Sequence, residues 1–193
     1  AKRIIAFYGN PLSRRMGILG QYAPDSMLAR LAKVCEEWQA ADSATTVQPA
    51  LHLIAVVASA DAGKDGKYRL RMDSALIERV YGWARANGAI LFLDVQPGLS
   101  SVMEELPKLS RFLERPDVHL GIDPEFNMRN FKDTIPPGKQ IGQLTATEIN
   151  YSIDFLAKLV ASKQLPPKVL VVHRFRQAMV RDAASIRLNP NVQ

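Results

Sequence analysis

Apolar runs alternate with amphipathic segments along the whole chain. Runs bounded by Gly, Pro, Asn or Asp predict strands, and these lie at residues 3–8, 51–58, 89–95, 118–122 and 169–172. Apolar residues at helical spacing predict helices, and these lie at residues 26–41, 73–87, 101–114, 145–160 and 177–184. Strands that alternate with helices form a parallel sheet covered by helices. The pattern therefore predicts an α/β fold.

Local signals mark several helix boundaries. Asp73 precedes one amphipathic segment and is a favourable N-cap residue. Thr145 and Glu148 have the spacing of a capping box, which predicts a helix start at residue 145. Pro107 lacks a backbone N–H, so we expect it to break or kink the helix at residues 101–114.

Two architectures are compatible with this order of elements. An open doubly wound sheet requires nothing further, whereas a complete (β/α)₈ barrel needs roughly 250 residues, and the chain has 193. The glycine-rich turn of dinucleotide-binding sheets is absent after the first strand, where Gly9-Asn10-Pro11 stands instead. Long segments follow the strands that end near residues 8, 58 and 122, as in barrels with active-site loops. We therefore predict a TIM-barrel-like (β/α) parallel barrel, incomplete, with about five to six strands.

Composition narrows the class of protein. Hydrophobic residues make up 47% and charged residues 23%, which is ordinary for a globular domain, and we assign residues 1–193 to a single domain. No run approaches about 18 apolar residues, so we expect no membrane span. The net charge of +6 favours anionic neighbours. The basic residues are scattered and are not interleaved with aromatic side chains, so we expect no nucleic-acid binding.

Polar residues gather where the predicted strands end, the edge at which (β/α) barrels carry their active sites. The candidate catalytic residues are the carboxylates Glu125, Asp123 and Asp94. The candidate substrate-binding residues at the same edge are Tyr8, Asn10, Gln96, Phe126, His173 and Arg174. In a barrel these side chains converge on one mouth.

The Asp123-Pro124-Glu125 stretch brings two acids together directly after a strand. Residues two apart on a strand share a face, so Asp123 and Glu125 are expected to point the same way. Glycoside hydrolysis uses two carboxyl groups, one as proton donor and one as base or nucleophile. We assign the proton donor to Glu125, held near the charge of Asp123 or Asp94, which favours its protonated form. The sequence therefore predicts a glycoside hydrolase-like protein that acts on a polysaccharide or cell-wall glycan.

Two other functions use the same residues. Asp94, Asp123, Glu125 and His173 are an oxygen-rich set suited to a divalent metal such as Mg²⁺, Mn²⁺ or Ca²⁺, which predicts a metal-assisted phosphodiesterase or hydrolase. The His173-Arg174 pair resembles that of glycerophosphodiester phosphodiesterase barrels, although it lies on a later strand here and Phe175 replaces their glycine. A barrel that binds carbohydrate without turning it over is the third hypothesis. The glycosidase hypothesis requires no cofactor.

Several segments together resemble an uncharacterised family of bacterial secreted or lipoprotein-type proteins. These segments are Ala6–Pro11, Leu93–Gly98, Gly121–Phe126, Ile141-Gly142 with Glu148–Asn150, and Leu170–Phe175. The resemblance runs through the whole chain. It implies a glycosidase-like (β/α) barrel and an extracellular or cell-envelope location.

The same resemblance implies a longer barrel than this sequence supplies. Members of the family continue past the position of Gln193 with a further strand and an acidic stretch, so we expect a chain that lacks its last strands. An incomplete barrel leaves the strand at 169–172 as an unpaired edge. We then expect self-association of the protein through that edge.

Overall fold

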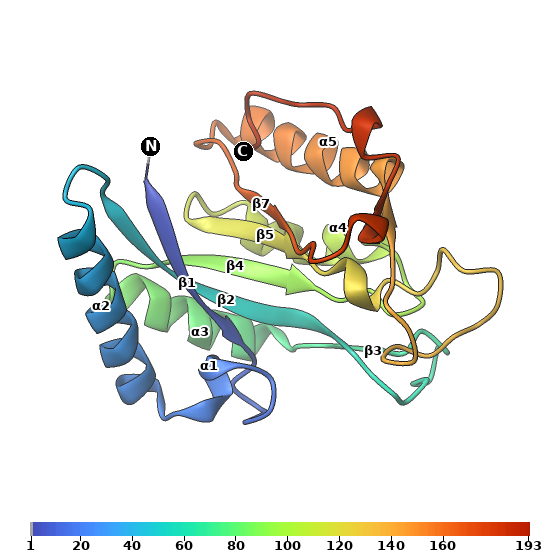
Figure 1. Cartoon of the computed structure of the whole chain (residues 1–193), viewed down its shortest axis with the longest axis horizontal. Coiled ribbons are helices and arrows are strands. Elements are labelled where there is room, and N and C mark those ends of the chain that lie inside the picture. Colours follow the sequence, from blue (N-terminus) through green and yellow to red (C-terminus); the bar gives the residue numbers. More distant parts are fainter. Residues whose placement is uncertain (1) are drawn as a thin grey trace. The chain divides into compact units, whose positions relative to one another are not determined.

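The computed structural model describes residues 2–193 and shows a mixed α/β fold (Figure 1). Its main sheet contains, in spatial order, β1 (Arg3–Gly9), β2 (Val47–Ala58), β4 (Ile90–Val95), β5 (Val118–Ile122) and β7 (Leu170–Val172), with β3 (Arg69–Arg71) paired to β2. The β1–β2 and β5–β7 pairs are parallel. The predicted α/β class with a five-stranded parallel sheet is therefore confirmed. The finer assignment to a TIM-barrel-like arrangement stays a prediction.

The chain forms two compact units. The first comprises the chain up to Ala55 together with Asp73–Leu93, and the second comprises Val56–Met72 together with Asp94–Gln193. Strands β2 and β4 each begin in the first unit and end in the second. The assignment of residues 1–193 to a single barrel domain stays a prediction.

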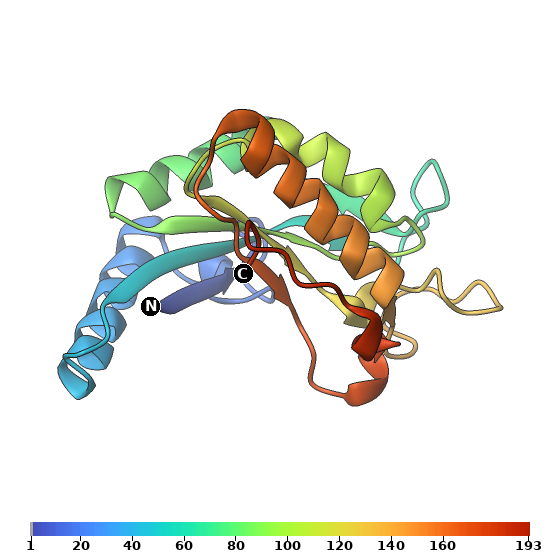
Figure 2. The same ribbon diagram turned by 90° about the horizontal axis from the view of Figure 1, so that it is seen from above.

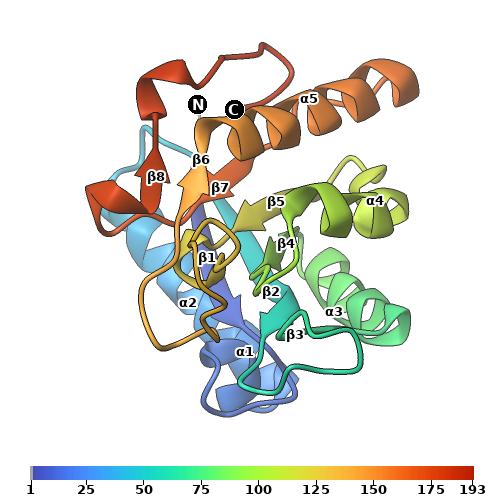
Figure 3. The same cartoon turned by 90° about the vertical axis from the view of Figure 1, so that its right-hand side faces the viewer.

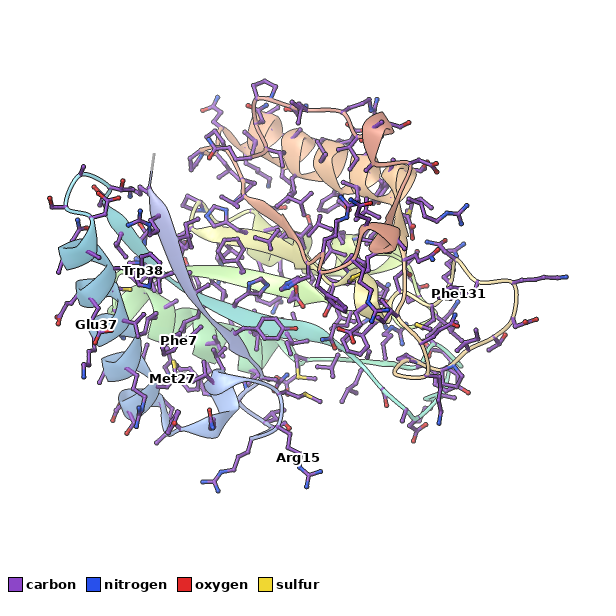
Figure 4. All side chains as sticks on the ribbon, viewed as in Figure 1. Phe7, Arg15, Met27, Glu37, Trp38 and Phe131 are labelled. Carbon is purple, nitrogen blue, oxygen red and sulfur yellow. The ribbon has the colours of Figure 1, made fainter. Side chains whose placement is uncertain are left out.

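In the first unit, β1 and β2 pair in parallel from Arg3–Val47 to Gly9–Leu53. Helix α2 (Pro24–Ala41) packs against β1 and buries Met27, which Figure 4 labels on the helix. Two further helices belong to this unit, α1 (Ile18–Gln21) and α3 (Ser74–Ala86). The Asp73 carboxylate accepts a 2.7 Å hydrogen bond from the backbone N–H of Leu76, which confirms the predicted cap of α3.

In the second unit, α4 (Val102–Leu113) and α5 (Ala146–Lys163) lie side by side (Figure 2). Thr145 and Glu148 form the predicted capping box at the start of α5. The expected break at Pro107 is wrong, because α4 continues through it. The buried residues of α4 lie on both sides of Pro107, so their packing holds the helix together despite the missing N–H donor. Among residues 2–193, no helix is both long and apolar enough to cross a membrane.

The segment predicted as one long loop after β2 contains β3, which pairs antiparallel with the end of β2. Its two arginines converge on the Glu105 carboxylate of α4. Arg69 Nε donates to Glu105 over 2.8 Å and Arg71 Nε over 2.5 Å. Glu105 has no exposed surface, and these bonds, with one from Ser100, hold the pKa of its carboxyl below the ordinary value although burial acts in the opposite direction. The buried ion pairs therefore fasten β3 to α4.

The predicted helix at residues 177–184 is wrong. The structure has two 3₁₀ turns instead, η2 (Gln177–Met179) and η3 (Ala183–Ser185), separated by β8 (Val180–Arg181). Asp182 adopts a left-handed backbone conformation with φ of 54°, which interrupts a right-handed helix. Strand β8 pairs in parallel with β6 (Leu144–Thr145) near the start of α5 (Figure 3).

The outer edge of β7 is partly covered by the last residues of the chain. Residues Lys168 and Val192 form a parallel bridge. Lys168 N–H donates to the carbonyl of Asn191 over 2.9 Å, and Leu170 N–H donates to the carbonyl of Gln193 over 2.8 Å. Self-association through this edge stays a prediction, and it is restricted to the part of β7 beyond Leu170.

Gly98 allows the loop after β4 to approach the loop after β2. Its φ of 63° lies in the left-handed region, and an added Cβ would lie 2.5 Å from the carbonyl oxygens of Lys67 and Tyr68. The adjacent Leu99 N–H donates to the carbonyl of Lys67 over 2.8 Å. Only glycine combines this backbone conformation with so close an approach.

The Gly98→Ala substitution should lower the free energy of unfolding by about 2–4 kcal/mol, because either the backbone of residue 98 or the facing loop must move. Gly82→Ala is the matched control, since Gly82 lies in α3 with no atom near an added Cβ. We expect the control to stabilise the protein by about 0.5–1 kcal/mol. Urea unfolding monitored by circular dichroism measures both, and equal midpoints for Gly98→Ala and the parent protein would contradict the proposed contact.

Candidate functional site

The carboxyl ends of β4, β5 and β7 are joined by main-chain hydrogen bonds in the second unit. Asp123 N–H donates to the carbonyl of Val95 over 3.0 Å, and His173 N–H donates to the carbonyl of Ile122 over 3.0 Å. These bonds bring together three of the predicted site residues, Asp94, Asp123 and His173, at neighbouring strand ends.

Asp94 and His173 form a direct pair. The Asp94 carboxylate has no exposed surface, and its Oδ1 lies 3.1 Å from Nε2 of His173. Burial acts to lower the pKa of His173, but the hydrogen bond to Asp94 and the negative charges of Asp94 and Asp123 raise it above the ordinary value. The surroundings therefore favour an imidazolium ion next to a buried carboxylate.

Asp123 has a strongly perturbed carboxyl group. Its side chain is buried, and burial together with the neighbouring charge of Asp94 raises the pKa of Asp123 to about 6. His173 and a 3.0 Å hydrogen bond from the N–H of Glu125 act in the opposite direction. A carboxyl group with this pKa is partly protonated near neutral pH and can donate a proton.

Glu125 occupies a different position from that expected. Strand alternation does not reach it, because the 3₁₀ turn η1 (Pro124–Phe126) begins directly after Asp123. The prediction that Asp123 and Glu125 share a strand face is therefore wrong. Asp123 is buried, whereas Glu125 is only half-buried on the turn that Asp123 caps. The burial that a proton donor needs is found at Asp123.

The other predicted substrate-binding residues of the second unit differ in how firmly they are held. Gln96 is buried, and its Oε1 accepts a 3.0 Å hydrogen bond from the N–H of Ala58, which links the ends of β4 and β2. Arg174 is exposed and donates to the carbonyl of Gln177 over 2.9 Å. Phe126 is half-buried on η1. Gln96 thus has a structural bond already, while Arg174 and Phe126 keep exposed surface for a ligand.

Tyr8 and Asn10 belong to the first unit. The Asn10 side chain is buried, donates to the carbonyl of Ile54 over 3.1 Å and accepts from the N–H of Leu12 over 2.9 Å. The Tyr8 ring lies edge-on to His52 with 5.2 Å between ring centroids. Asn10 therefore fixes the turn after β1, and a role in substrate binding stays a prediction for both residues.

Glu148 has a role that the sequence did not reveal. Beyond its capping-box bonds, its carboxylate accepts from Asn127 Nδ2 over 3.0 Å and from Asn130 Nδ2 over 2.7 Å. Gly142 N–H also donates to the carbonyl of Glu125 over 2.6 Å. The long loop after η1 is therefore tied both to α5 and to the turn that carries Glu125. The capping box was the only sequence signal at this position.

The predicted metal-ligand set contains one close pair in the second unit. Asp94 and His173 present a carboxylate oxygen and an imidazole nitrogen 3.1 Å apart, and such a pair can bind one divalent ion if the imidazole is neutral. Asp123 follows the neighbouring strand, whereas Glu125 lies on the turn beyond it. A metal bound there would compete with a proton on His173.

The elevated pKa of Asp123 has a direct spectroscopic consequence. We expect its carboxyl carbon to titrate near pH 6 in ¹³C NMR. The Asp94→Asn variant should shift this titration to lower pH, because it removes the neighbouring negative charge. Asp154→Asn, an exposed substitution on α5, serves as the control and should leave the titration unchanged.

The same group links stability to pH. The folded protein binds a proton at Asp123 more tightly than the unfolded chain does, so the stabilisation is present below about pH 4 and is lost as pH rises through about 6. The tighter proton binding of the folded state corresponds to about 2–3 kcal/mol of stabilisation at low pH. In the Asp123→Asn variant, the free energy of unfolding should fall less between about pH 4 and pH 6 than in the parent protein, as measured by urea titration at each pH. An unchanged pH dependence would contradict the raised pKa.

Comparison of the chain with known proteins returned no match. No family model, no curated protein and no solved structure is similar to it by sequence or fold at the level that would indicate relationship.

Proposed function

We propose that the protein is a glycoside hydrolase-like enzyme that acts on a polysaccharide or cell-wall glycan through Asp123 and Asp94. The observation that carries the proposal is the buried Asp123 carboxyl, whose pKa is raised to about 6 by burial and by the charge of Asp94. Glycosidases need one carboxyl group that holds its proton near neutral pH and a second that stays ionised. Asp123 has the property of the first group.

The roles follow from the contacts of each side chain. Asp123 donates its proton to the glycosidic oxygen as the bond to the leaving sugar breaks. Water then adds to the anomeric carbon of the remaining sugar and gives a proton back to Asp123. Asp94, paired with His173 at 3.1 Å, supplies the negative charge that stabilises the positively charged sugar in the transition state. His173 acts as a positioning residue, because its imidazole fixes the Asp94 carboxylate.

The exposed groups around this pair suit substrate recognition. Glu125 and Arg174 offer polar groups to sugar hydroxyls, and Phe126 offers an aromatic ring. In this proposal Glu125 contacts the ligand, whereas the sequence pattern predicted it to be the proton donor. The same proposal includes the incomplete TIM-barrel-like arrangement, the likeness to secreted or lipoprotein-type bacterial proteins, and an extracellular or cell-envelope location.

The second candidate is a metal-assisted phosphodiesterase or hydrolase. The 3.1 Å separation of Asp94 Oδ1 and His173 Nε2 favours it, since the two atoms suit one divalent ion. The ion would polarise a phosphoryl oxygen or activate water. A barrel that binds carbohydrate without turnover has no specific contact in its favour.

Asp123→Asn should reduce hydrolysis of a responsive glycan by about a thousandfold, because the amide cannot supply the proton. Binding of the same glycan should persist. The parent activity should fall as pH rises above about 6, as Asp123 loses its proton. Asp154→Asn is the matched control, since this exposed aspartate pairs with Arg187 on the surface.

A reducing-sugar assay on a panel of polysaccharides, with and without EDTA, separates the candidates. Activity that survives the chelator and depends on Asp123 supports the glycosidase. Loss of activity with EDTA and recovery with Mg²⁺ or Mn²⁺ would favour the metal-assisted enzyme. Full activity of Asp123→Asn would refute the assignment of Asp123 as proton donor. If the protein binds a glycan but hydrolyses none of those tested, it is a carbohydrate-binding barrel and not an enzyme.

A further inference from the structure

A polar groove of about 600 Å³ lies in the second unit, among the loops that follow β2, β4 and β5. Charged side chains from the first and third of these loops line it, together with Leu99, Glu104 and Phe131. Figure 4 labels Phe131 on the long loop after η1. These loops leave the same strand ends that carry Asp94 and Asp123.

Main-chain hydrogen bonds join the walls of this groove. Leu99 N–H donates to the carbonyl of Lys67 over 2.8 Å, and Met128 N–H donates to the carbonyl of Gly98 over 2.9 Å. Gly98 N–H in turn donates to the carbonyl of Phe126 over 2.8 Å. The loop after β4 is thus hydrogen-bonded to the loop after β2 and to the loop after β5. These bonds hold the groove in shape without a ligand.

Two acids of the groove lining are ion-paired to arginines of β3, which they share with the buried Glu105. Asp65 lies 2.9 Å from Arg69 Nη2, and Glu104 lies 3.2 Å from both Arg69 and Arg71. The hydrogen bond from the Arg69 side chain lowers the pKa of the Asp65 carboxyl, and the backbone N–H of Lys67 and the charge of Arg69 act in the same direction. Asp133 is the remaining carboxylate of the lining.

The basic side chains of the groove have no such partners. Within residues 2–193, no carboxylate lies within ion-pair distance of Lys67, Arg129 or Lys132. Arg129 and Lys132 are exposed, and Lys67 is half-buried. Lys67, Arg129 and Lys132 therefore outnumber the one unpaired carboxylate, Asp133. With the ion-paired arginines and their three carboxylates included, the groove keeps a net charge of +1, which attracts an anionic ligand.

We infer that this groove binds the anionic substituents of an acidic glycan, either uronate carboxylates or phosphodiester groups. Lys67, Arg129 and Lys132 supply the charge, and the half-buried ring of Phe131 supplies an aromatic surface for a sugar ring. A single aromatic residue makes the groove unlike the repeated stacking platforms that bind single-stranded nucleic acid. The inference rests on the proposed function, since it names the substrate class of that enzyme.

The test is a binding measurement on the full chain by affinity electrophoresis, with polygalacturonate, a glycerol-phosphate polymer and neutral dextran as probes. We expect retention by at least one acidic polymer and none by dextran. The Arg129→Gln/Lys132→Gln variant should lose about tenfold in affinity for the retained polymer. Lys139→Gln/Arg176→Gln removes the same charge from exposed residues outside the groove lining and should lose much less.

The outcomes separate this inference from the proposed activity. Equal losses in both double variants, or equal retention by dextran, would overturn the groove assignment even if glycans are hydrolysed. Retention by an acidic polymer without any hydrolysis would refute the proposed enzymatic activity but would still support anion binding in the groove. Preference between the two acidic polymers identifies the anionic group. An oligodeoxynucleotide that binds more tightly than either would overturn the glycan assignment.

Discussion

The buried carboxylate of Glu105 is the constraint on which the loops of the second unit depend. A charged group without exposed surface is tolerated only when ion pairs and hydrogen bonds replace its water. Arg69, Arg71 and Ser100 provide these bonds, from β3 and from the segment before α4. The chain after β2 must therefore return to α4, and the chain after β4 must pass close to it. Removing the carboxylate would take away one of the three ion-pair partners of the buried Arg69 and one of the two partners of Arg71, and would loosen both loops.

Buried charges at the two ends of β5 and β7 have different consequences. Lys168, just before β7, is fully buried, and its ammonium group donates to two backbone carbonyls, those of Val118 and Arg115. Burial lowers the pKa of Lys168 to about 8, but the bonds give it a structural role. Asp123, at the opposite end, lies beside another carboxylate. An unfavourable charge arrangement that packing does not require is a feature of functional sites.

Sequence patterns predicted those parts of the fold that depend on neighbours in the chain. Apolar runs located the main strands, and the Thr145–Glu148 spacing located the start of α5. Backbone turns that break a regular pattern escaped prediction. The left-handed Asp182 disrupted an expected helix, and the turn at Pro124 moved Glu125 out of register with Asp123. The carboxyl cluster itself was predictable, because parallel strands end at one edge, but which acid is buried depends on how each strand end packs.

The pairing of the C-terminal residues with β7 has a consequence for misassembly. An open strand edge is a template on which other chains can add strands and aggregate. The hydrogen bonds from Lys168 and Leu170 to the segment at Asn191–Gln193 occupy the amino-terminal part of this edge. An incoming strand could therefore pair only with the backbone groups of β7 beyond Leu170. The segment at Asn191–Gln193 thus shortens the strand edge on which another chain could polymerise.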